Sequence, residues 1–203
     1  MLKKISYMTA GESHGKGLIG IIEGIPAGMN ITEEYIEKDL LRRMQGHGRG
    51  GRMKIEKDHA EIFSGVRHAV TLGSPISLLI KNFDWVNWED RMATGKPKKE
   101  HRKVSMPRPG HADLAGVMKY GLDDIRNVLE RSSARETAMR VAIGAVCRKL
   151  LEEVGITVGS RVYQIHNIVD NTPVSNDMGL KELNDTVDAS PVRCFDKDAE
   201  KKM

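Results

Sequence analysis

The segment SARETAMRVAIGAVCRKLLEEVG, residues 133–155, decides the fold because it predicts the central helix of the chain. Its small apolar residues recur at the spacing of one helix face. These residues are Ala138, Val141, Ala142, Ala145 and Val146. The first four residues have the pattern of a capping box, in which Ser133 caps the backbone and Glu136 reaches back, and Gly155 marks the helix end. We therefore predict a core helix that packs closely against a sheet or another helix.

Short aliphatic segments on the N-terminal side of this helix supply strands for such a sheet. Residues 18–25, LIGIIEGI, end before Pro26 and are typical of a buried strand. AEIFSGV at 60–66 and PISLLIK at 75–81 predict two more strands, with a turn at 68–73 between them.

A second helix is predicted from Thr32 to Met44, TEEYIEKDLLRRM. Its first turn is acidic and its last turn carries Arg42 and Arg43, which matches the helix dipole, and Gly46 provides a stop. Its apolar stripe consists of Ile36, Leu40 and Met44.

Composition limits the class of protein. The 203 residues are 39% hydrophobic, enough for one substantial core. A net charge of +4 and a pI of about 9.0 favour anionic partners, which include nucleic acid, acidic metabolites and phosphorylated cofactors. Cys147 and Cys194 form neither a disulfide framework nor a metal motif, and no apolar run has the length of a signal peptide or membrane span. These features predict a soluble cytoplasmic protein without a bound metal or a membrane partner.

QGHGRGGR, residues 45–52, places Arg49 and Arg52 among four glycines. Glycine is used where the backbone must turn sharply or approach a ligand closely, so the segment predicts an anion-binding loop. A longer basic segment, residues 91–107, contains six Lys or Arg and almost nothing apolar. We expect a mobile loop there, which is either a solvated surface or a lid that attracts an anionic ligand.

GESHGKGLIG, residues 11–20, contains the spacing G-x-G-x-x-G but runs into a strand, whereas the dinucleotide fingerprint needs a strand before its glycines and a helix after them. We therefore reject a dinucleotide site and expect Ser13 and His14 to lie in a turn bounded by glycines. The serine hydrolase motif G-x-S-x-G is not matched either.

Two further segments carry candidate site residues. In MPRPGHADLAG, residues 106–116, two prolines and a glycine hold Arg108 and His111 on a rigid bend, although a lone histidine is more often structural. RSSAR, residues 131–135, combines two arginines and two hydroxyls with a helix N-terminus, which suits a phosphate. The alternative is that the serine only caps the helix and the arginines pair with surface acids.

Taken together, five segments in this order closely resemble the N-terminal part of chorismate synthases. They are AGESHGKGLIGIIEGIPAG, GRGGRMKIEKD, SGVRHAVTLGSPI, RPGHADLAGVMKY and RSSARETAMRVAIGAV, within residues 7–170. The resemblance implies an α+β fold, a β-α-β sandwich with central helices between outer sheets. It also implies that residues 1–203 are a single partial domain of a longer protein, because the C-terminal half of the family pattern is absent from this chain.

The family converts 5-enolpyruvylshikimate 3-phosphate into chorismate and phosphate by a 1,4-anti elimination that needs reduced FMN, a step of the shikimate pathway. The resemblance implies that His14 helps to protonate the departing phosphate and that His111 serves the protonation state of the reduced flavin. Both roles suit imidazole, which is acid or base near neutral pH. NADPH is a candidate electron source, and full-length members form homotetramers.

The family motifs also imply the contacts with substrate and cofactor. The implied substrate residues are Ser13, Arg43, Arg49, Arg52, Arg108, Ala134 and Arg135. The implied flavin contacts are Arg131, Ser132 and Ser133. Guanidinium groups match phosphate and carboxylate geometry, and a cluster of them would repel itself without an anion, so substrate or sulfate should raise the thermal midpoint.

Two other functions fit parts of the sequence. One is a flavin-binding fragment without elimination activity. The other is an RGG-type nucleic-acid-binding module, suggested by GRGGR but disfavoured by an aromatic content of only 4% and a modest net charge. We therefore expect a small-molecule enzyme rather than a nucleic-acid partner.

Overall fold

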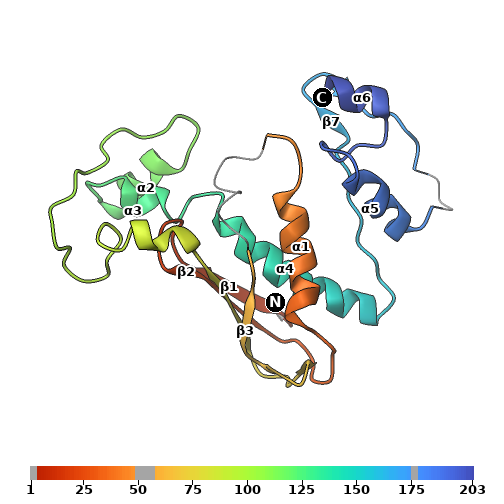
Figure 1. The fold of residues 1–203 in the computed structure, drawn as a ribbon, viewed down its shortest axis with the longest axis horizontal. Helices are drawn as coiled ribbons and strands as arrows, with labels where there is room; N and C mark the ends of the chain where they lie inside the picture. The colour runs from red at the N-terminus through yellow and green to blue at the C-terminus, as the bar shows by residue number, and fades with distance from the viewer. Residues whose placement is uncertain (1–3, 49–57, 175–177) are drawn as a thin grey trace.

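A four-stranded antiparallel sheet forms the base of the molecule (Figure 1). The structure is a computed structural model that describes residues 4–48, 58–174 and 178–203. The strands are β1 (Ser6–Ala10), β2 (Gly17–Glu23), β3 (Glu61–Ser64) and β6 (Ile76–Lys81), in the order β1-β2-β6-β3. Every neighbouring pair is antiparallel. The predicted strands at 18–25 and 75–81 are confirmed as the two central strands.

Two helices, α1 (Glu33–Met44) and α4 (Glu136–Glu153), pack on each other, and α4 lies against the sheet (Figure 1). The core is formed by the inward residues of the strands and by the apolar stripes of both helices. Close packing depends on Gly20 of β2, since a Cβ atom there would come within 2.5 Å of the Met139 Sδ atom. The predicted core helix is thus confirmed, and it contacts both a sheet and another helix.

The ends of the two helices differ in how well the sequence predicts them. Thr32 caps α1 as expected, because its side chain accepts a hydrogen bond from the Tyr35 N–H. The predicted capping box of α4 is wrong: the helix begins at Glu136, whose carboxylate accepts from Thr9 and Arg140 instead of reaching back. The predicted stop is confirmed, since Gly155 follows α4 with a φ of 77°.

The strand predicted at 60–66 is divided by Gly65, which has a φ of 81°. A Cβ atom on this glycine would lie 2.6 Å from the Pro75 carbonyl oxygen, so only glycine fits. Beyond it, β4 (Val66–Arg67) pairs with β5 (Val70–Thr71) in a separate hairpin. The segment predicted as a plain turn therefore contains a short strand.

Two smaller lobes complete the described chain (Figure 1). One contains the 3-10 helix η2 (Phe83–Asn87) with α2 (Asp113–Tyr120) and α3 (Arg126–Leu129). The other contains the hairpin β7 (Gln164–Ile165) and β8 (Ile168–Val169) with α5 (Leu180–Asp188) and α6 (Lys197–Lys202). None of the helices in the described ranges is long and apolar enough to cross a lipid bilayer.

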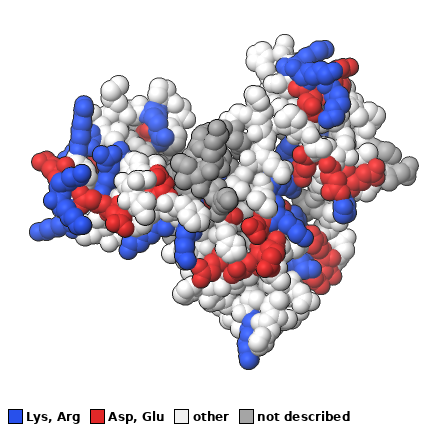
Figure 2. Space-filling model, viewed as in Figure 1, with Lys and Arg blue, Asp and Glu red and all other residues white. Residues whose placement is uncertain are grey.

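The basic segment 91–107 forms no helix or strand, in agreement with the predicted loop. It belongs to the lobe of α2 and α3, on whose surface Lys and Arg side chains gather (Figure 2). Asp90 anchors the loop, because its carboxylate accepts from the Lys98 N–H at 2.5 Å and lies 2.8 Å from His101 Nε2. Mobility of this loop stays a prediction.

Candidate functional site

The turn between β1 and β2 carries Ser13 and His14 at the end of the sheet. The turn is tight, since a Cβ atom on Gly11 would lie 2.4 Å from the Gly17 carbonyl oxygen. Ser13 is buried and its N–H donates to the Glu130 carbonyl oxygen at 2.9 Å. The His14 N–H donates to Glu130 Oε2 at 3.0 Å, and His14 Nδ1 lies 2.8 Å from the same oxygen. The buried Glu130 therefore holds both the backbone and the ring of this histidine.

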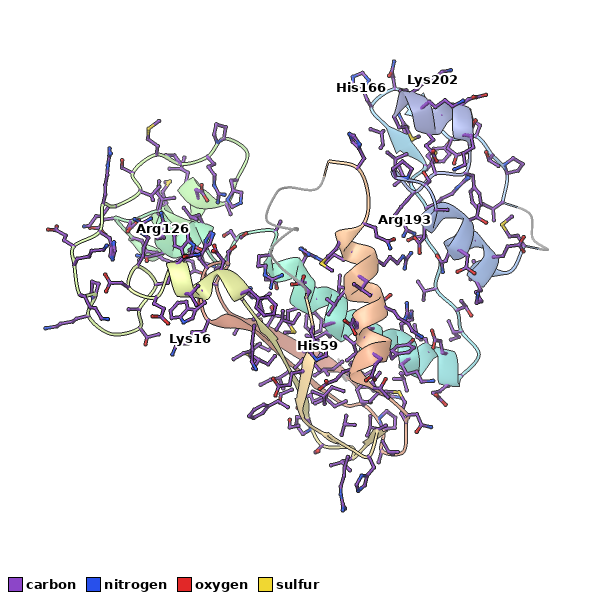
Figure 3. The ribbon with its side chains drawn as sticks, in the orientation of Figure 1. Lys16, His59, Arg126, His166, Arg193 and Lys202 are labelled. Atoms are coloured by element: carbon purple, nitrogen blue, oxygen red, sulfur yellow. The ribbon has the colours of Figure 1, made fainter. Side chains whose placement is uncertain are left out.

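An indole ring and a guanidinium surround the same histidine. The His14 ring stacks on Trp88 with a distance of 3.8 Å between ring centroids. Arg126 donates to Glu130 Oε1 at 2.8 Å and also lies over Trp88, 5.2 Å from its ring centroid. Figure 3 shows Arg126 in the lobe of α3, near the end of the sheet that carries Lys16. These contacts join the lobe to the sheet at His14.

A second cluster lies where the C-terminal end of α1 meets the start of α4. Arg135 forms a buried ion pair with Asp58, and Arg43 Nη1 lies 3.4 Å from Asp58 Oδ2. Arg43 Nη2 also donates to the Ala134 carbonyl oxygen at 3.1 Å. Because Asp58 is 2% exposed, two guanidinium groups share one carboxylate away from solvent.

Asn82 connects this cluster to the turn of His14. Its side-chain oxygen accepts from Arg135 Nε at 2.9 Å. Its amide nitrogen donates to the carbonyl oxygens of Glu12 at 3.1 Å and Gly15 at 2.8 Å. The arginine cluster and the histidine turn are therefore held in one hydrogen-bonded network.

The predicted bend before α2 holds Arg108 and His111 around a buried carboxylate. Asp113 accepts from Arg108 Nε at 2.9 Å and lies 2.6 Å from His111 Nδ1, and Gly110 turns the backbone with a φ of 70°. The Arg108 guanidinium holds the pKa of the Asp113 carboxyl well below its usual range. Asp113 raises the pKa of Arg108, with a smaller contribution from Glu130, so this bend is electrostatically linked to the His14 cluster.

The predicted flavin contacts lie in the connection between α3 and α4. Arg131 Nη2 donates to the carbonyl oxygen of Thr9 at 2.9 Å and to its hydroxyl at 2.8 Å. Arg131 Nη1 is buried and makes no hydrogen bond within the described residues, and Glu136 Oε1 lies 3.5 Å from it. Ser132 and Ser133 are half-buried on the same connection.

The structure brings most of the predicted site together. The network around Asn82 and Glu130 contains Ser13, His14, Arg43, Ala134 and Arg135. Arg131, Ser132 and Ser133 adjoin it in sequence, and Arg108 and His111 form the neighbouring bend. The two remaining candidates, Arg49 and Arg52, lie outside the described residues.

The arginines differ from the predicted cluster in one respect, because carboxylates lie among them. Asp58 contacts Arg43 and Arg135, and Asp113 contacts Arg108. Mutual repulsion is therefore offset in the protein itself. The alternative that the RSSAR arginines pair with surface acids is wrong for Arg135, whose partner Asp58 is buried, whereas Arg131 Nη1 lies 3.5 Å from Glu136, which is 12% exposed.

Sequence reasoning missed the residues that connect the site. They are Asp58, Asn82, Trp88, Asp113 and Glu130. Two signals were present, because Glu130 directly precedes the RSSAR segment and Asp113 follows His111 by two positions. Nothing in the local sequence pattern distinguishes the other three, Asp58, Asn82 and Trp88, from ordinary surface residues.

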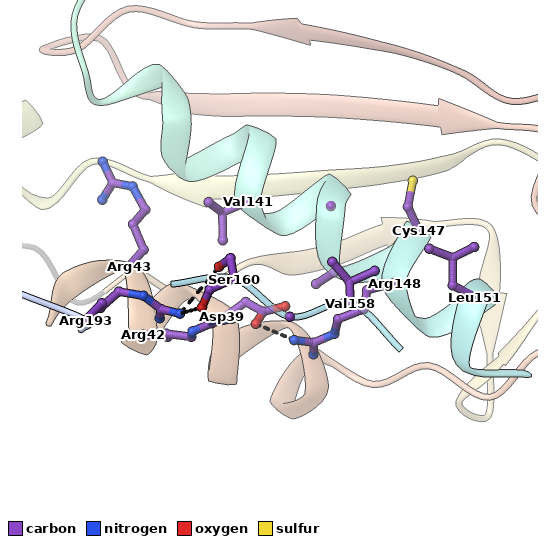
Figure 4. Close-up of a pocket in the computed structure, with 13 residues that line it drawn as sticks. Asp39, Arg42, Arg43, Val141, Cys147, Arg148, Leu151, Val158, Ser160 and Arg193 are labelled. Carbon is purple, nitrogen blue, oxygen red and sulfur yellow. Dashed lines mark hydrogen bonds and ion pairs between the residues drawn. The ribbon is translucent and has the colours of Figure 1, made fainter. Parts of the chain in front are cut away.

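A groove of about 520 Å³ lies beside the site, between α1, α4 and the segment 158–160 (Figure 4). Its floor is apolar, with Val141 and Leu151 of α4, and Arg43 reaches it from α1. Figure 4 shows Asp39 of α1 joined to Arg148 of α4, with 2.6 Å between Oδ1 and Nη1. Within the described ranges, no group of three or more His, Cys, Asp or Glu residues could hold a metal ion.

Comparison with known proteins gives consistent results. The sequence profile of the family described as Chorismate synthase matches residues 5–203. Chorismate synthase from Listeria welshimeri is 53% identical over 200 residues, which cover 97% of this chain and 51% of that protein. The enzyme of the same name from Alkaliphilus metalliredigens is 56% identical over 196 residues, covering 97% of this chain and 50% of the relative.

A solved structure shares the fold. A crystal structure of chorismate synthase superposes with a TM-score of 0.72 at 40% sequence identity, and the match covers all of this chain and 52% of the other. The chain thus spans about half the length of the curated relatives it matches.

Proposed function

This chain belongs to the chorismate synthase family, and on that premise we propose that it forms the part of the enzyme that binds 5-enolpyruvylshikimate 3-phosphate and carries both histidines. The reaction is the 1,4-anti elimination in which a C–H bond and the C–O bond to phosphate break, giving chorismate and inorganic phosphate. The observation that carries the proposal is the network in which Asn82 joins the Arg43 and Arg135 cluster to the turn of His14.

The arginines and the buried serine suit the substrate. Its phosphate and two carboxylates need several fixed cations, and the guanidinium fork matches both kinds of anion. Arg43, Arg135 and Arg108 are already oriented by buried carboxylates, so little side-chain freedom is lost when an anion binds. We include Arg49 and Arg52, together with Ser13 and Ala134, in the proposed substrate site.

The two histidines receive different tasks. His14 lies in the network with Arg135 and is proposed to donate a proton to the departing phosphate. His111 lies on the neighbouring bend and is proposed to exchange a proton with the reduced cofactor. Nδ1 of each imidazole lies beside a buried carboxylate, and Arg108 Nη2 lies 3.2 Å from His111 Nε2. We propose Nε2 of each ring as the nitrogen for the exchange.

The residues at the start of α4 fit reduced FMN as the cofactor. Arg131 Nη1 is a buried donor without a hydrogen bond in the described chain, which suits an anionic group, and Ser132 and Ser133 offer hydroxyls beside it. Arg131, Ser132 and Ser133 would hold the flavin. When bound, it supplies electron density transiently without net oxidation of the substrate.

Finer properties of the complete enzyme are part of the same proposal. We propose the β-α-β sandwich for the full-length fold, in which α1 and α4 lie between the present sheet and a second one. We also propose a homotetramer for the full-length enzyme and a cytoplasmic location, with NADPH or a separate reductase as the source of electrons. The free thiols of Cys147 and Cys194 agree with a reducing compartment.

The test is phosphate release by the 203-residue chain with photoreduced FMN. Release that is lost in His14→Asn and Arg135→Met variants supports the proposal. FMN binding without phosphate release favours the second candidate, a flavin-binding fragment, which the half-length match to its relatives motivates. Tight filter binding of single-stranded RNA that weakens between 50 mM and 200 mM salt would instead favour a nucleic-acid-binding module.

A further inference from the structure

We propose that Glu130 is the positioning residue for His14: its carboxylate fixes the plane of the imidazole and keeps a proton on Nδ1, so that His14 exchanges its other proton through Nε2. The chemical role of His14 rests on the proposed function, whereas the tautomer assigned here rests on the contacts of Glu130 alone.

The first argument is the number of contacts that converge on Glu130. Its Oε2 accepts from the His14 N–H at 3.0 Å and lies 2.8 Å from His14 Nδ1, while its carbonyl oxygen accepts from the Ser13 N–H. One residue thus anchors the backbone and the side chain of the turn. It lies 116 positions away in sequence, so this contact also fixes α3 against the β1–β2 turn.

The second argument is the chemistry of the donor and acceptor. A carboxylate only accepts hydrogen bonds, so the imidazole nitrogen that faces it must carry the proton. Arg126 forms an ion pair with Glu130 on the side away from His14, with 2.8 Å between Nη1 and Oε1. Because the Glu130 side chain is 1% exposed, water does not compete for these positions.

The third argument is the aromatic partner. Trp88 stacks on the His14 ring at 3.8 Å, with 26° between the two planes, and Arg126 lies over the same indole. Glu130 and Trp88 therefore restrict different motions, since the carboxylate opposes a flip of the ring and the indole opposes its tilt. A proton donor that must reach a leaving phosphate gains from both restrictions.

The second histidine repeats the arrangement, which argues against coincidence. His111 Nδ1 lies 2.6 Å from a buried aspartate, Asp113, and that aspartate is also held by an arginine, Arg108. In both places a buried carboxylate lies between the Nδ1 atom of a histidine and an arginine, although Arg108 also lies 3.2 Å from His111 Nε2.

The experiment uses the 203-residue chain with ¹⁵N-labelled histidine and no ligand. Two-bond ¹H–¹⁵N spectra of the neutral imidazole distinguish the two tautomers, and a His14→Gln variant assigns the signal. We expect the Nδ1–H form for His14. A Glu130→Met variant has no acceptor for Nδ1, so the signal should move toward the Nε2–H form, while Glu130→Asp should retain the Nδ1–H form.

The matched control is Asp39→Asn, which removes a carboxylate from an arginine pair between α1 and α4 and should leave the His14 spectrum unchanged. A His14 signal of the Nε2–H form in the unaltered chain would overturn the proposal, and so would an unchanged tautomer in a folded Glu130→Met variant. Circular dichroism checks folding; if Glu130→Met does not fold, the unaltered chain and Glu130→Asp still decide.

Kinetics provide a second readout that depends on the proposed function. Glu130→Met should lower kcat by about 10²-fold with little change in KM, because proton transfer is impaired and substrate contacts remain. Absence of phosphate release in the unaltered chain would contradict the proposed function, yet the spectra would still test the tautomer. The two failures are therefore distinguishable.

Discussion

Removing the carboxylate that Arg43 and Arg135 share should destabilise the protein strongly. Asp58→Asn preserves the shape of the side chain and eliminates its charge. The side chains of Asp58 and Arg135 are 1% and 5% exposed, so solvent screens their ion pair very little. Loss of one partner from a buried pair costs about 3–5 kcal/mol, and we expect the free energy of unfolding to fall by this amount.

The comparison variant is Asp39→Asn, which breaks the ion pair with Arg148. There the side chains are 12% and 25% exposed, so solvent screens more of the interaction. We expect a loss of about 1 kcal/mol. Urea denaturation followed by circular dichroism measures both values.

Sulfate adds a second measurement to the same pair of variants. A bound anion can replace the missing carboxylate, so sulfate should stabilise Asp58→Asn more than it stabilises the unaltered chain. Equal losses in the two variants, or a loss below about 1 kcal/mol for Asp58→Asn, would refute the reasoning that the buried pair holds the arginines. A sulfate effect that is the same in all three proteins would contradict the anion site.

Three further substitutions test the fold and the second histidine. Gly20→Ala should lower the free energy of unfolding by about 1–3 kcal/mol, because its Cβ would collide with Met139; urea denaturation measures the change. Thr32→Ala should cost about 1 kcal/mol through loss of the helix cap that Tyr35 engages, and Thr32→Ser should restore most of it. The lowered pKa of Asp113 stabilises the protein at pH values above the ordinary aspartate pKa of about 3.9, and this contribution is lost as the pH falls. The Asp113→Asn substitution should therefore flatten the decline of the thermal midpoint below about pH 4. An unchanged slope would contradict that contribution.

The elements that the sequence predicts well are those set by local pattern. The strand at β2, the helix α1 with its Thr32 cap and the stop at Gly155 each depend on neighbouring residues, and each is confirmed. The predicted capping box of α4 is wrong because the Glu136 side chain makes other hydrogen bonds. Its carboxylate accepts from Thr9 and Arg140 and does not reach back to the helix start.

The residues of the site also fall into two groups, those that the sequence pattern indicates and those that it does not. Ser13, His14 and the arginines stand in segments whose composition marks them, and the resemblance to a known family assigns them roles. Asp58 could not be found by pattern, and Glu130 is marked only by its place directly before RSSAR, because an acidic residue of a buried pair looks the same in sequence as one on the surface. Their partners lie 77 and 116 positions away.

The buried carboxylates beneath the arginines also bear on which ligands can compete for the site. An incoming anion meets guanidinium groups that already have counter-ions, so its attraction must exceed that of Asp58 and Asp113 for the same groups. A monovalent metabolite offers no advantage over these resident charges, whereas a molecule with several negative groups can engage several arginines at once. The proposed substrate site would thus select polyanions over the abundant small anions of a cell before any contact with the carbon skeleton is made.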